Sequence, residues 1–390
     1  MPTYNRARYL DCLLADLVAH IGELGYSYEL LIGDNASEDD TPDVVGKYED
    51  KLAMRYIRRP ENVGAAPNIV RLFGAARGRY LVYVADDDLL IPAALGRHIA
   101  YLEANPDVGA VYAPWFIHDR VAAQDIDQFY AVDHETTIAA GDHGALFDFL
   151  VKGHVFPEIY VARTSLVKDV LNTDTPLAFY FFVQIARMVD RAAVTFSPEP
   201  FYRSITRYFE GESRSQYGHE EVKSGWDRYR GGLEYILSRV AHLLDAENLA
   251  WCHRAIDHFA RMRMQVALRV RTLAGRDWID NYYVATRLRC VGDDSLLPMP
   301  YENYRINAAL EYLLGLQPFY PAPSTVMYYL DDPPQILTQA WDFGTAGLVA
   351  RADRSVPLPD NTILLTSREK AVSEGSLFVI SEHELLAKFP

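Results

Sequence analysis

Helix and strand signals alternate along the first 115 residues with a regularity that few folds allow. Four strand-like runs are predicted, at residues 28–33, 54–58, 80–85 and 108–113. The segments between them have apolar residues at helical spacing, and prolines or glycines stand where such helices begin or end. Alternation of this kind predicts an α/β fold: a mostly parallel sheet with helices on both faces.

Polar residues gather where the predicted strands end. Asp34 follows the first run, Asn62 follows the second, and three consecutive aspartates, Asp86, Asp87 and Asp88, follow the third. Open parallel sheets bind their ligands outside the carboxyl ends of their strands. We therefore predict a binding crevice at this edge of the sheet.

The charge of the chain restricts what that crevice can bind. A formal net charge of −15 argues against a surface that tracks the phosphates of nucleic acid or of an anionic membrane. Carboxylates approach a phosphorylated ligand only through a divalent cation, and hard oxygen ligands suit Mn²⁺ or Mg²⁺. If the acidic triplet leaves the strand in extended form, Asp86 and Asp88 project to the same side and are the candidate metal ligands.

The remainder of the chain divides by pattern. We predict a first domain over residues 1–219, a helical region over 220–317 and a small α/β module of short strands over 318–390. Within the first domain, residues 117–142 have no clear period, which is typical of a mobile flap or acceptor loop. The apolar faces of the long helices are compatible with packing on the first domain, with acceptor contacts or with a homodimer.

Cysteine usage and hydropathy indicate a soluble, cytoplasmic protein. The three cysteines, Cys12, Cys252 and Cys290, are far apart in sequence and form no disulfide or zinc pattern. Charged residues interrupt the first twenty positions, and no apolar run approaches the ~18–20 residues that span a bilayer. The sequence thus predicts neither a signal peptide nor an integral membrane segment.

Four segments, 1–8, 33–41, 62–68 and 79–92, resemble in order and content the family 2 glycosyltransferases of GT-A fold. Those enzymes move a sugar from a nucleotide diphosphate donor to an acceptor hydroxyl, with a divalent metal at the diphosphate. The resemblance implies that Asp88 is the main metal ligand, with Asp86 near the ribose. It also implies that Asp87 and Asn62 lie in the donor site.

Further donor contacts follow from the same resemblance. Pro2, Thr3 and Tyr4 correspond to the loop that lines the base, and Asp34 to the acceptor of a pyrimidine N3–H, which favours a UDP- or dTDP-sugar. Residues 201–215 resemble the flexible loop that closes over the diphosphate. In or just after that loop, Arg207 is a candidate phosphate ligand and His219 a candidate third metal ligand.

The sequence offers two candidates for the catalytic base. Inverting members use an Asp or Glu to take the proton of the acceptor hydroxyl. The helix predicted at 178–189 has no acid at its start, so the candidates are Glu158, which precedes an apolar strand, and Asp174, just upstream of that helix. Glu158 is preferred. A retaining mechanism, which needs no such base, stays open.

One feature departs from the family. The Pro-Thr-Tyr-Asn motif normally follows a central apolar strand, but here the motif begins at residue 2. An unfilled slot would expose strand edges, so we expect another segment, either upstream residues or the C-terminal strands, to occupy it.

Two other functions remain open. A catalytically silent nucleotide-sugar-binding protein is consistent with the missing acid at the start of the 178–189 helix. A sugar-1-phosphate nucleotidylyltransferase shares the nucleotide-binding half-sheet, but its Gly-rich opening loop is absent here.

Overall fold

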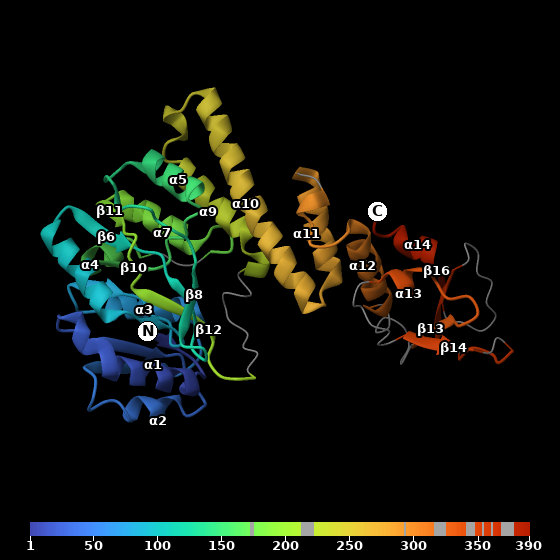
Figure 1. The fold of residues 1–390 in the computed structure, drawn as a ribbon, viewed down its shortest axis with the longest axis horizontal. Coiled ribbons are helices and arrows are strands. Elements are labelled where there is room, and N and C mark those ends of the chain that lie inside the picture. The colour runs from blue at the N-terminus through green and yellow to red at the C-terminus, as the bar shows by residue number, and fades with distance from the viewer. Residues whose placement is uncertain are drawn as a thin grey trace. The chain divides into compact units, whose positions relative to one another are not determined.

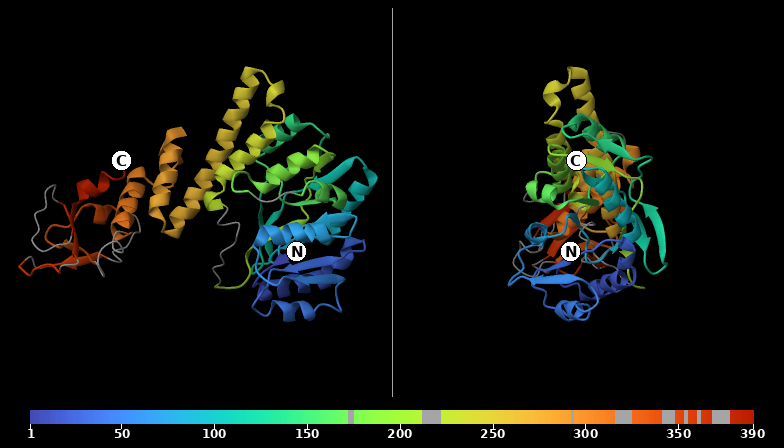
Figure 2. Two further views of the ribbon diagram at one scale, coloured as in Figure 1. Left: turned by 180° about the vertical axis from the view of Figure 1, so that it is seen from behind. Right: turned by 90° about the vertical axis from the view of Figure 1, so that its left-hand side faces the viewer.

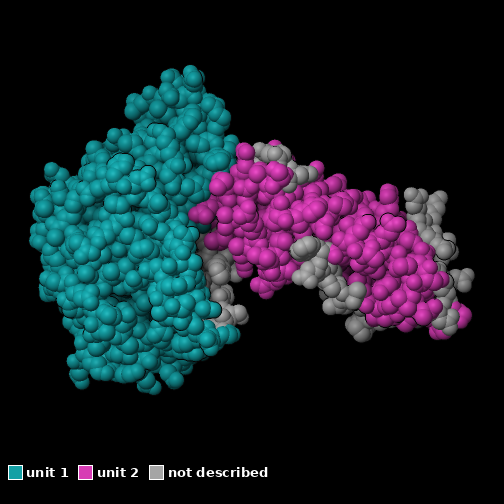
Figure 3. Space-filling view, in the orientation of Figure 1, with its two compact units in different colours: residues 1–216, 227–259 teal, residues 217–226, 260–390 magenta. Residues whose placement is uncertain are grey.

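The computed structural model describes nine segments of the chain. They are residues 1–171, 175–211, 222–291, 294–315, 325–340, 348–352, 355–359, 362–367 and 378–390. The chain forms two compact units, residues 1–216 with 227–259 and residues 217–226 with 260–390 (Figure 3). The three-part division expected from sequence patterns stays a prediction.

Unit 1 begins with a parallel three-stranded sheet, as the alternating pattern predicts. Its strands, in spatial order, are β1 (Pro2–Thr3), β2 (Leu30–Asp34) and β3 (Met54–Arg58). Figures 1 and 2 show α1 and α2 on one side of this sheet and α3 on the other. The helices are α1 (Ala7–His20), α2 (Thr41–Gly46) and α3 (Ala65–Ala75). Both faces are covered, which explains why the predicted strand at 28–33 is an apolar run rather than an alternating one.

A second, mixed sheet of five strands forms the centre of unit 1. In spatial order these are β4 (Tyr80–Val82), β10 (Tyr160–Arg163), β6 (Val108–Tyr112), β11 (Ala193–Phe196) and β9 (Thr136–Ile138). Only β6 and β11 run parallel, and the other neighbours are antiparallel. The helices of this part are α4 (Pro92–Ala104), α5 (His143–Lys152), α6 (Thr164–Asp169) and α7 (Tyr180–Val189).

Residues 117–142, expected to be an irregular flap or acceptor loop, contain regular strands. This stretch contributes β9 to the five-stranded sheet and two strands, β7 (Phe116–Asp119) and β8 (Gln124–Gln128), to a third sheet. The spatial order of the third sheet is β5 (Leu89–Leu90), β12 (Tyr202–Arg207), β7 and β8. Strand β8 is polar and mostly exposed, so it shows no apolar period. Pairing with β7, the hydrogen bond between Asp125 and His118 and the ion pair of Asp125 with Arg203 stabilise it instead.

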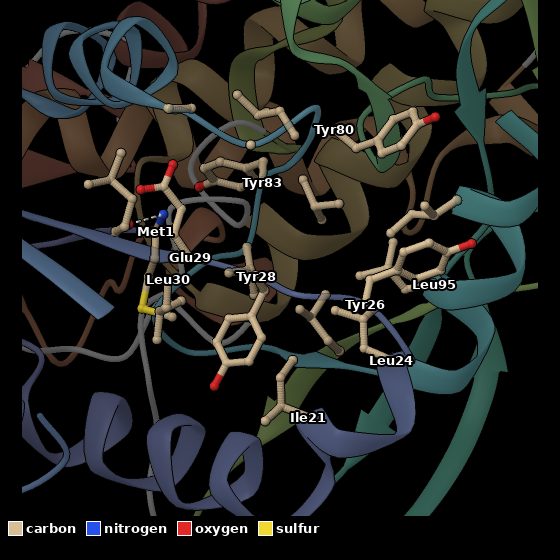
Figure 4. A pocket seen from close by; sticks show the side chains of 18 of the residues that line it. Met1, Ile21, Leu24, Tyr26, Tyr28, Glu29, Leu30, Tyr80, Tyr83 and Leu95 are labelled. Atoms are coloured by element: carbon tan, nitrogen blue, oxygen red, sulfur yellow. Dashed lines mark hydrogen bonds between the residues drawn. The ribbon is translucent and has the colours of Figure 1, made fainter. Parts of the chain in front are cut away.

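Within the described residues, no segment occupies the position of the central strand that normally precedes the Pro-Thr-Tyr-Asn motif. Strand β1 has two residues, β2 pairs with β1 and β3, and β4 pairs with β10 alone. Between β2 and β4 lies a cavity of about 400 Å³ (Figure 4). Apolar side chains from several elements line it, among them Leu17, Ile21, Leu31, Leu72, Phe73, Leu81, Leu95 and Ile99. The C-terminal strands do not enter it, because they pair with one another in unit 2.

The helices and short strands expected after residue 220 are confirmed. The long helices are α9 (Trp226–Leu237), α10 (Ala246–Ala274), α11 (Trp278–Val291) and α12 (Tyr301–Gly315). In unit 2 a parallel sheet has the order β14 (Leu348–Arg351), β13 (Thr325–Tyr329), β15 (Thr362–Thr366) and β16 (Phe378–Ser381). Two short helices accompany it, α13 (Ile336–Gln339) and α14 (Glu382–Leu386). In the part of the chain that the structure describes, no helix has the length and apolar character needed to cross a membrane.

Two adjacent glycines of α9 allow close packing inside unit 1. A Cβ at Gly231 would lie 2.0 Å from the Leu177 carbonyl oxygen, and one at Gly232 would lie 2.8 Å from Cβ of Phe182. We expect Gly231→Ala to reduce the free energy of unfolding by about 2–4 kcal/mol, because backbone must move to admit the methyl group. Chemical denaturation measures this. The matched control is Gly74→Ala in α3, where the added Cβ meets nothing within 4 Å and helix propensity should increase stability. A loss in both variants would contradict the packing argument.

Candidate active site

The acidic triplet lies in a turn and not at the end of an extended strand. Strand β4 ends at Val82, and the Asp88 N–H donates to the Ala85 carbonyl at 3.4 Å to close the turn. The strand expected over 80–85 is present but ends at Val82. The argument that alternate aspartates project to one side of an extended strand was wrong, because residues 86–88 lie in a turn. Strand β5 follows this turn directly.

Asp88 is held by β12. Its Oδ2 accepts a hydrogen bond from the Tyr202 hydroxyl at 2.8 Å, and its Oδ1 accepts one from the Ile205 N–H at 2.8 Å. The segment 202–207 was expected to belong to a flexible closing loop. It is instead a paired strand that lies against β5 and β7, next to the acidic turn.

Asp86 is the buried member of the triplet. Burial and the neighbouring Asp87 raise the pKa of its carboxyl to about 7. Asp87 itself pairs with Arg6 of the N-terminal loop, at 3.4 Å. The buried Thr3 hydroxyl lies beside Asp86 but, in the structure as described, has no hydrogen-bond partner of normal geometry. A buried carboxylate and a buried hydroxyl therefore lie side by side, at the end of β1 and in the turn that follows β4.

Asp34 is fully buried at the carboxyl end of β2. Its Oδ1 accepts from the Ser37 N–H at 2.8 Å, while its Oδ2 accepts from the Tyr56 hydroxyl and lies 3.5 Å from Nε of Arg58. Burial and the Asp34 carboxylate raise the pKa of the Tyr56 hydroxyl, which keeps it a donor. The two residues from β3 thus fix the orientation of this carboxylate.

The other predicted donor residues surround Asp34. Asn62 is exposed, and its Oδ1 accepts from the Asn35 side chain and from the Gly64 N–H at 2.9 Å. Tyr4 is 41% exposed, as a base-stacking ring would need to be. Pro2 and Thr3 form β1, which is parallel to β2 and in register with Gly33 and Asp34.

Arg207 has a carboxylate partner within the protein. At the end of β12 its Nη2 lies 2.7 Å from Oδ2 of Asp119 on β7. The guanidinium remains half exposed. A role at a phosphate would therefore require Arg207 to exchange or share this partner.

Glu158 lies near the acidic turn, although about seventy residues separate them in sequence. The carboxylates of Asp86, Asp87, Asp88 and Glu158 all contribute to raising the pKa of Tyr83, after burial itself. Glu158 likewise acts on the buried Tyr130. The structure therefore brings Glu158 into the same region as the triplet. Asp174 and His219 lie outside the described residues.

A metal site is incomplete among these groups. Over the described segments no set of three or more His, Cys, Asp or Glu side chains is arranged to hold a metal ion. The residues that sequence reasoning missed are those that orient the carboxylates: Tyr202, Tyr56 and Arg58. Their signal is three-dimensional, since strand pairing brings them to the aspartates and no sequence spacing encodes it.

Residues 1–147 match the family described as Glycosyl transferase family 2. The match lies in the part of the chain that contains the four motifs and confirms the resemblance that they indicated.

Individual proteins match over limited lengths. The uncharacterized protein Rv1520 of Mycobacterium tuberculosis is 31% identical over 115 residues, which cover 29% of this chain and 33% of that protein. Chondroitin synthase of Pasteurella multocida is 24% identical over 237 residues, 60% of this chain and 23% of the synthase. The chain thus spans a third or less of the length of these relatives. The crystal structure of S. aureus TarS 1–349 in complex with UDP aligns with a TM-score of 0.46 at 14% identity, over 81% of this chain and 79% of that one.

Proposed function

We propose that this protein is a metal-dependent glycosyltransferase that transfers a sugar, with inversion, from a UDP- or dTDP-sugar to an acceptor hydroxyl. The observation that carries the proposal is the acidic turn after β4, in which Asp86 is buried close to β1, within the residues that match this family. The acceptor is a hydroxyl compound of undefined class, and the long helices are candidate surfaces for it or for a second copy.

The residues present fit a divalent cation. Asp86 is buried with a raised pKa, so its ionised form lacks compensation that a cation would supply. Asp86 and Asp88 would hold Mn²⁺ or Mg²⁺, and His219 is a candidate third ligand. When bound, the metal stabilises negative charge on the departing diphosphate.

The protein's own groups then have separate roles. Asp34 would accept the N3–H of uracil or thymine, and Tyr4 would stack on the base. The buried Thr3 hydroxyl lies beside Asp86, the carboxylate expected near the ribose. Glu158 would take the proton of the acceptor hydroxyl. At the same time the oxygen of that hydroxyl would bond to the anomeric carbon of the sugar, and the bond from this carbon to the diphosphate would break. Asp174 is the second candidate for this role.

The test is turnover of UDP-sugars with added Mn²⁺, followed as release of UDP. We expect slow hydrolysis, which Asp88→Ala should reduce by at least 100-fold, and stabilisation of the protein by UDP that depends on the metal. Thermal shift with several nucleoside diphosphates, with and without Mn²⁺, identifies the nucleobase that the donor site prefers. Tight metal-dependent binding without turnover would instead support the silent binding protein, and the absence of any nucleotide effect would overturn the site.

A separate prediction concerns the catalytic base. Glu158→Gln should lower transfer to an acceptor by about 10²–10⁴-fold, because the amide cannot take the proton, while metal-dependent UDP binding is kept. Comparing the two readouts in one variant checks this. Full transfer activity in the variant would exclude Glu158 and leave Asp174 or a retaining mechanism.

A further inference from the structure

One tyrosine joins the two ends of the acidic turn. Tyr202 is 2% exposed, and antiparallel pairing of β12 with β5 places it opposite Leu90. Its hydroxyl donates to Oδ2 of Asp88 at 2.8 Å and accepts from the N–H of Ala85 at 3.1 Å. A single oxygen thus bonds both to the residue before the triplet and to the carboxylate of its last member.

A second bond from the same strand completes the restraint. The Ile205 N–H donates to Oδ1 of Asp88 at 2.8 Å, so β12 bonds both oxygens of this carboxylate. A carboxylate oxygen can accept a hydrogen bond and still coordinate a cation, and partners of this kind orient the ligand before the metal arrives. With its side chain fixed in advance, Asp88 loses little rotamer freedom when a cation binds.

We propose that Tyr202 is a positioning residue that presents Asp88 to the divalent cation of the donor complex, an inference that rests on the proposed function. Tyr202 need not touch the nucleotide or the sugar. Its contribution should appear in the affinity for the metal, because the carboxylate that it orients is the metal's ligand. Binding of the nucleotide without metal does not use Asp88 in this way and should not change.

A purely structural role for Tyr202 is the alternative, since a buried tyrosine hydroxyl also stabilises a core. Tyr160 provides the matched control. It is also 2% exposed and in unit 1, and its hydroxyl accepts a hydrogen bond from Gln184 at 2.9 Å. Tyr160→Phe removes one buried hydroxyl and one hydrogen bond in β10 without altering the bonds to Asp88.

The experiment measures Mn²⁺ affinity by titration in the presence of saturating UDP, for the wild type, Tyr202→Phe and Tyr160→Phe. UDP affinity without metal and thermal stability are measured on the same samples. We expect Tyr202→Phe to weaken Mn²⁺ binding by about 10–100-fold. UDP affinity without metal should stay within about twofold, and Tyr160→Phe should bind Mn²⁺ as the wild type does.

The outcomes separate the two proposals. If the wild type does not bind Mn²⁺ with UDP, the proposed function fails. If the wild type binds but Tyr202→Phe binds equally well, the positioning role is overturned and the function stands. Two further outcomes would also overturn the positioning role, because each indicates a general structural effect. One is an equal loss of Mn²⁺ affinity in Tyr202→Phe and Tyr160→Phe. The other is a loss of metal-free UDP affinity in Tyr202→Phe as large as its loss of Mn²⁺ affinity.

Discussion

A short apolar strand fused ahead of Met1 is expected to raise the melting temperature of this protein by about 10 °C. The cavity of about 400 Å³ between β2 and β4 has the lining of a buried strand position (Figure 4). Helices cover both of its faces, with Leu17 of α1 on one side and Leu72 and Phe73 of α3 on the other. Most of the lining is apolar on both sides, with Glu29, Arg79 and Glu103 among the remaining residues, so a Val/Ile run suits a strand there better than an alternating sequence.

The hydrogen-bond ladder for such a strand has already begun. The Gly33 N–H donates to the Met1 carbonyl at 2.9 Å, and the Met1 amino group donates to the Leu31 carbonyl at 2.9 Å. By the parallel pattern, the Leu31 N–H would next donate to the residue two positions ahead of Met1. Burial lowers the pKa of the Met1 amino group to about 5, so folding at pH 7 must neutralise an amine that is mostly charged when unfolded. An amide N–H makes the same bond without this cost, which is about 1 kcal/mol.

The expected increase in the free energy of unfolding can be estimated from burial and conformational entropy. Burying each Val or Ile side chain contributes about 1.5–3 kcal/mol, against about 1–2 kcal/mol for fixing its backbone and less for its side chain. Five residues and the removed amine should give about 3–5 kcal/mol, and each kcal/mol is worth about 2–4 °C in a unit of this size. The measurement is thermal unfolding of chains extended by Val-Val-Ile-Val-Ile or by Ser-Lys-Ser-Glu-Ser. The polar extension replaces the amine equally but cannot fill the cavity, so equal Tm values for the two would contradict the strand position.

The order of elements in the first 115 residues could be predicted because each strand and helix has its own local signal. Pro42 and Pro92 both stand in the first turn of a helix, α2 and α4, and the strand at 54–58 is found with its predicted bounds. Local signals failed where pairing decides the structure. Strand β8 is polar along its length and is recognisable only through its partner β7.

The candidate site divides in the same way. The positions of Asp34 and of the acidic triplet after their strands were predictable, since strand ends meet at one edge of a sheet. The orientation of each carboxylate was not. It depends on Tyr56 and Arg58 for Asp34 and on Tyr202 and Ile205 for Asp88, residues that β-pairing brings in from other parts of the chain. The turn at 86–88 was missed because a strand's apolar pattern does not mark where its hydrogen bonding stops.

The buried charge of Asp86 should make the protein less stable than a neutral variant when no ligand is present. Its folded pKa is about 7, whereas an ordinary aspartate titrates near 3.9. Between these values the folded state holds a proton that the unfolded state has released, so the free energy of unfolding falls as pH rises from about 4 to 7. Above pH 7 the loss is complete. At 1.4 kcal/mol for each pKa unit, it is on the order of 2–4 kcal/mol.

Asp86→Asn removes this effect and should separate stability from function. Without ligand at pH 8, the variant should unfold about 4 °C or more above the wild type, and the difference should shrink towards zero near pH 4. Mn²⁺ with UDP should then stabilise the wild type but not the variant, because the amide cannot compensate a cation's charge. Thermal unfolding across pH 4–8, with and without Mn²⁺ and UDP, measures both effects. Asp50→Asn, at an exposed site, is the control and should change the Tm little at any pH. An Asp86→Asn variant that is less stable than the wild type at pH 8 would mean that the carboxylate is already compensated within the protein, and the argument that this turn awaits a cation would lose its main support.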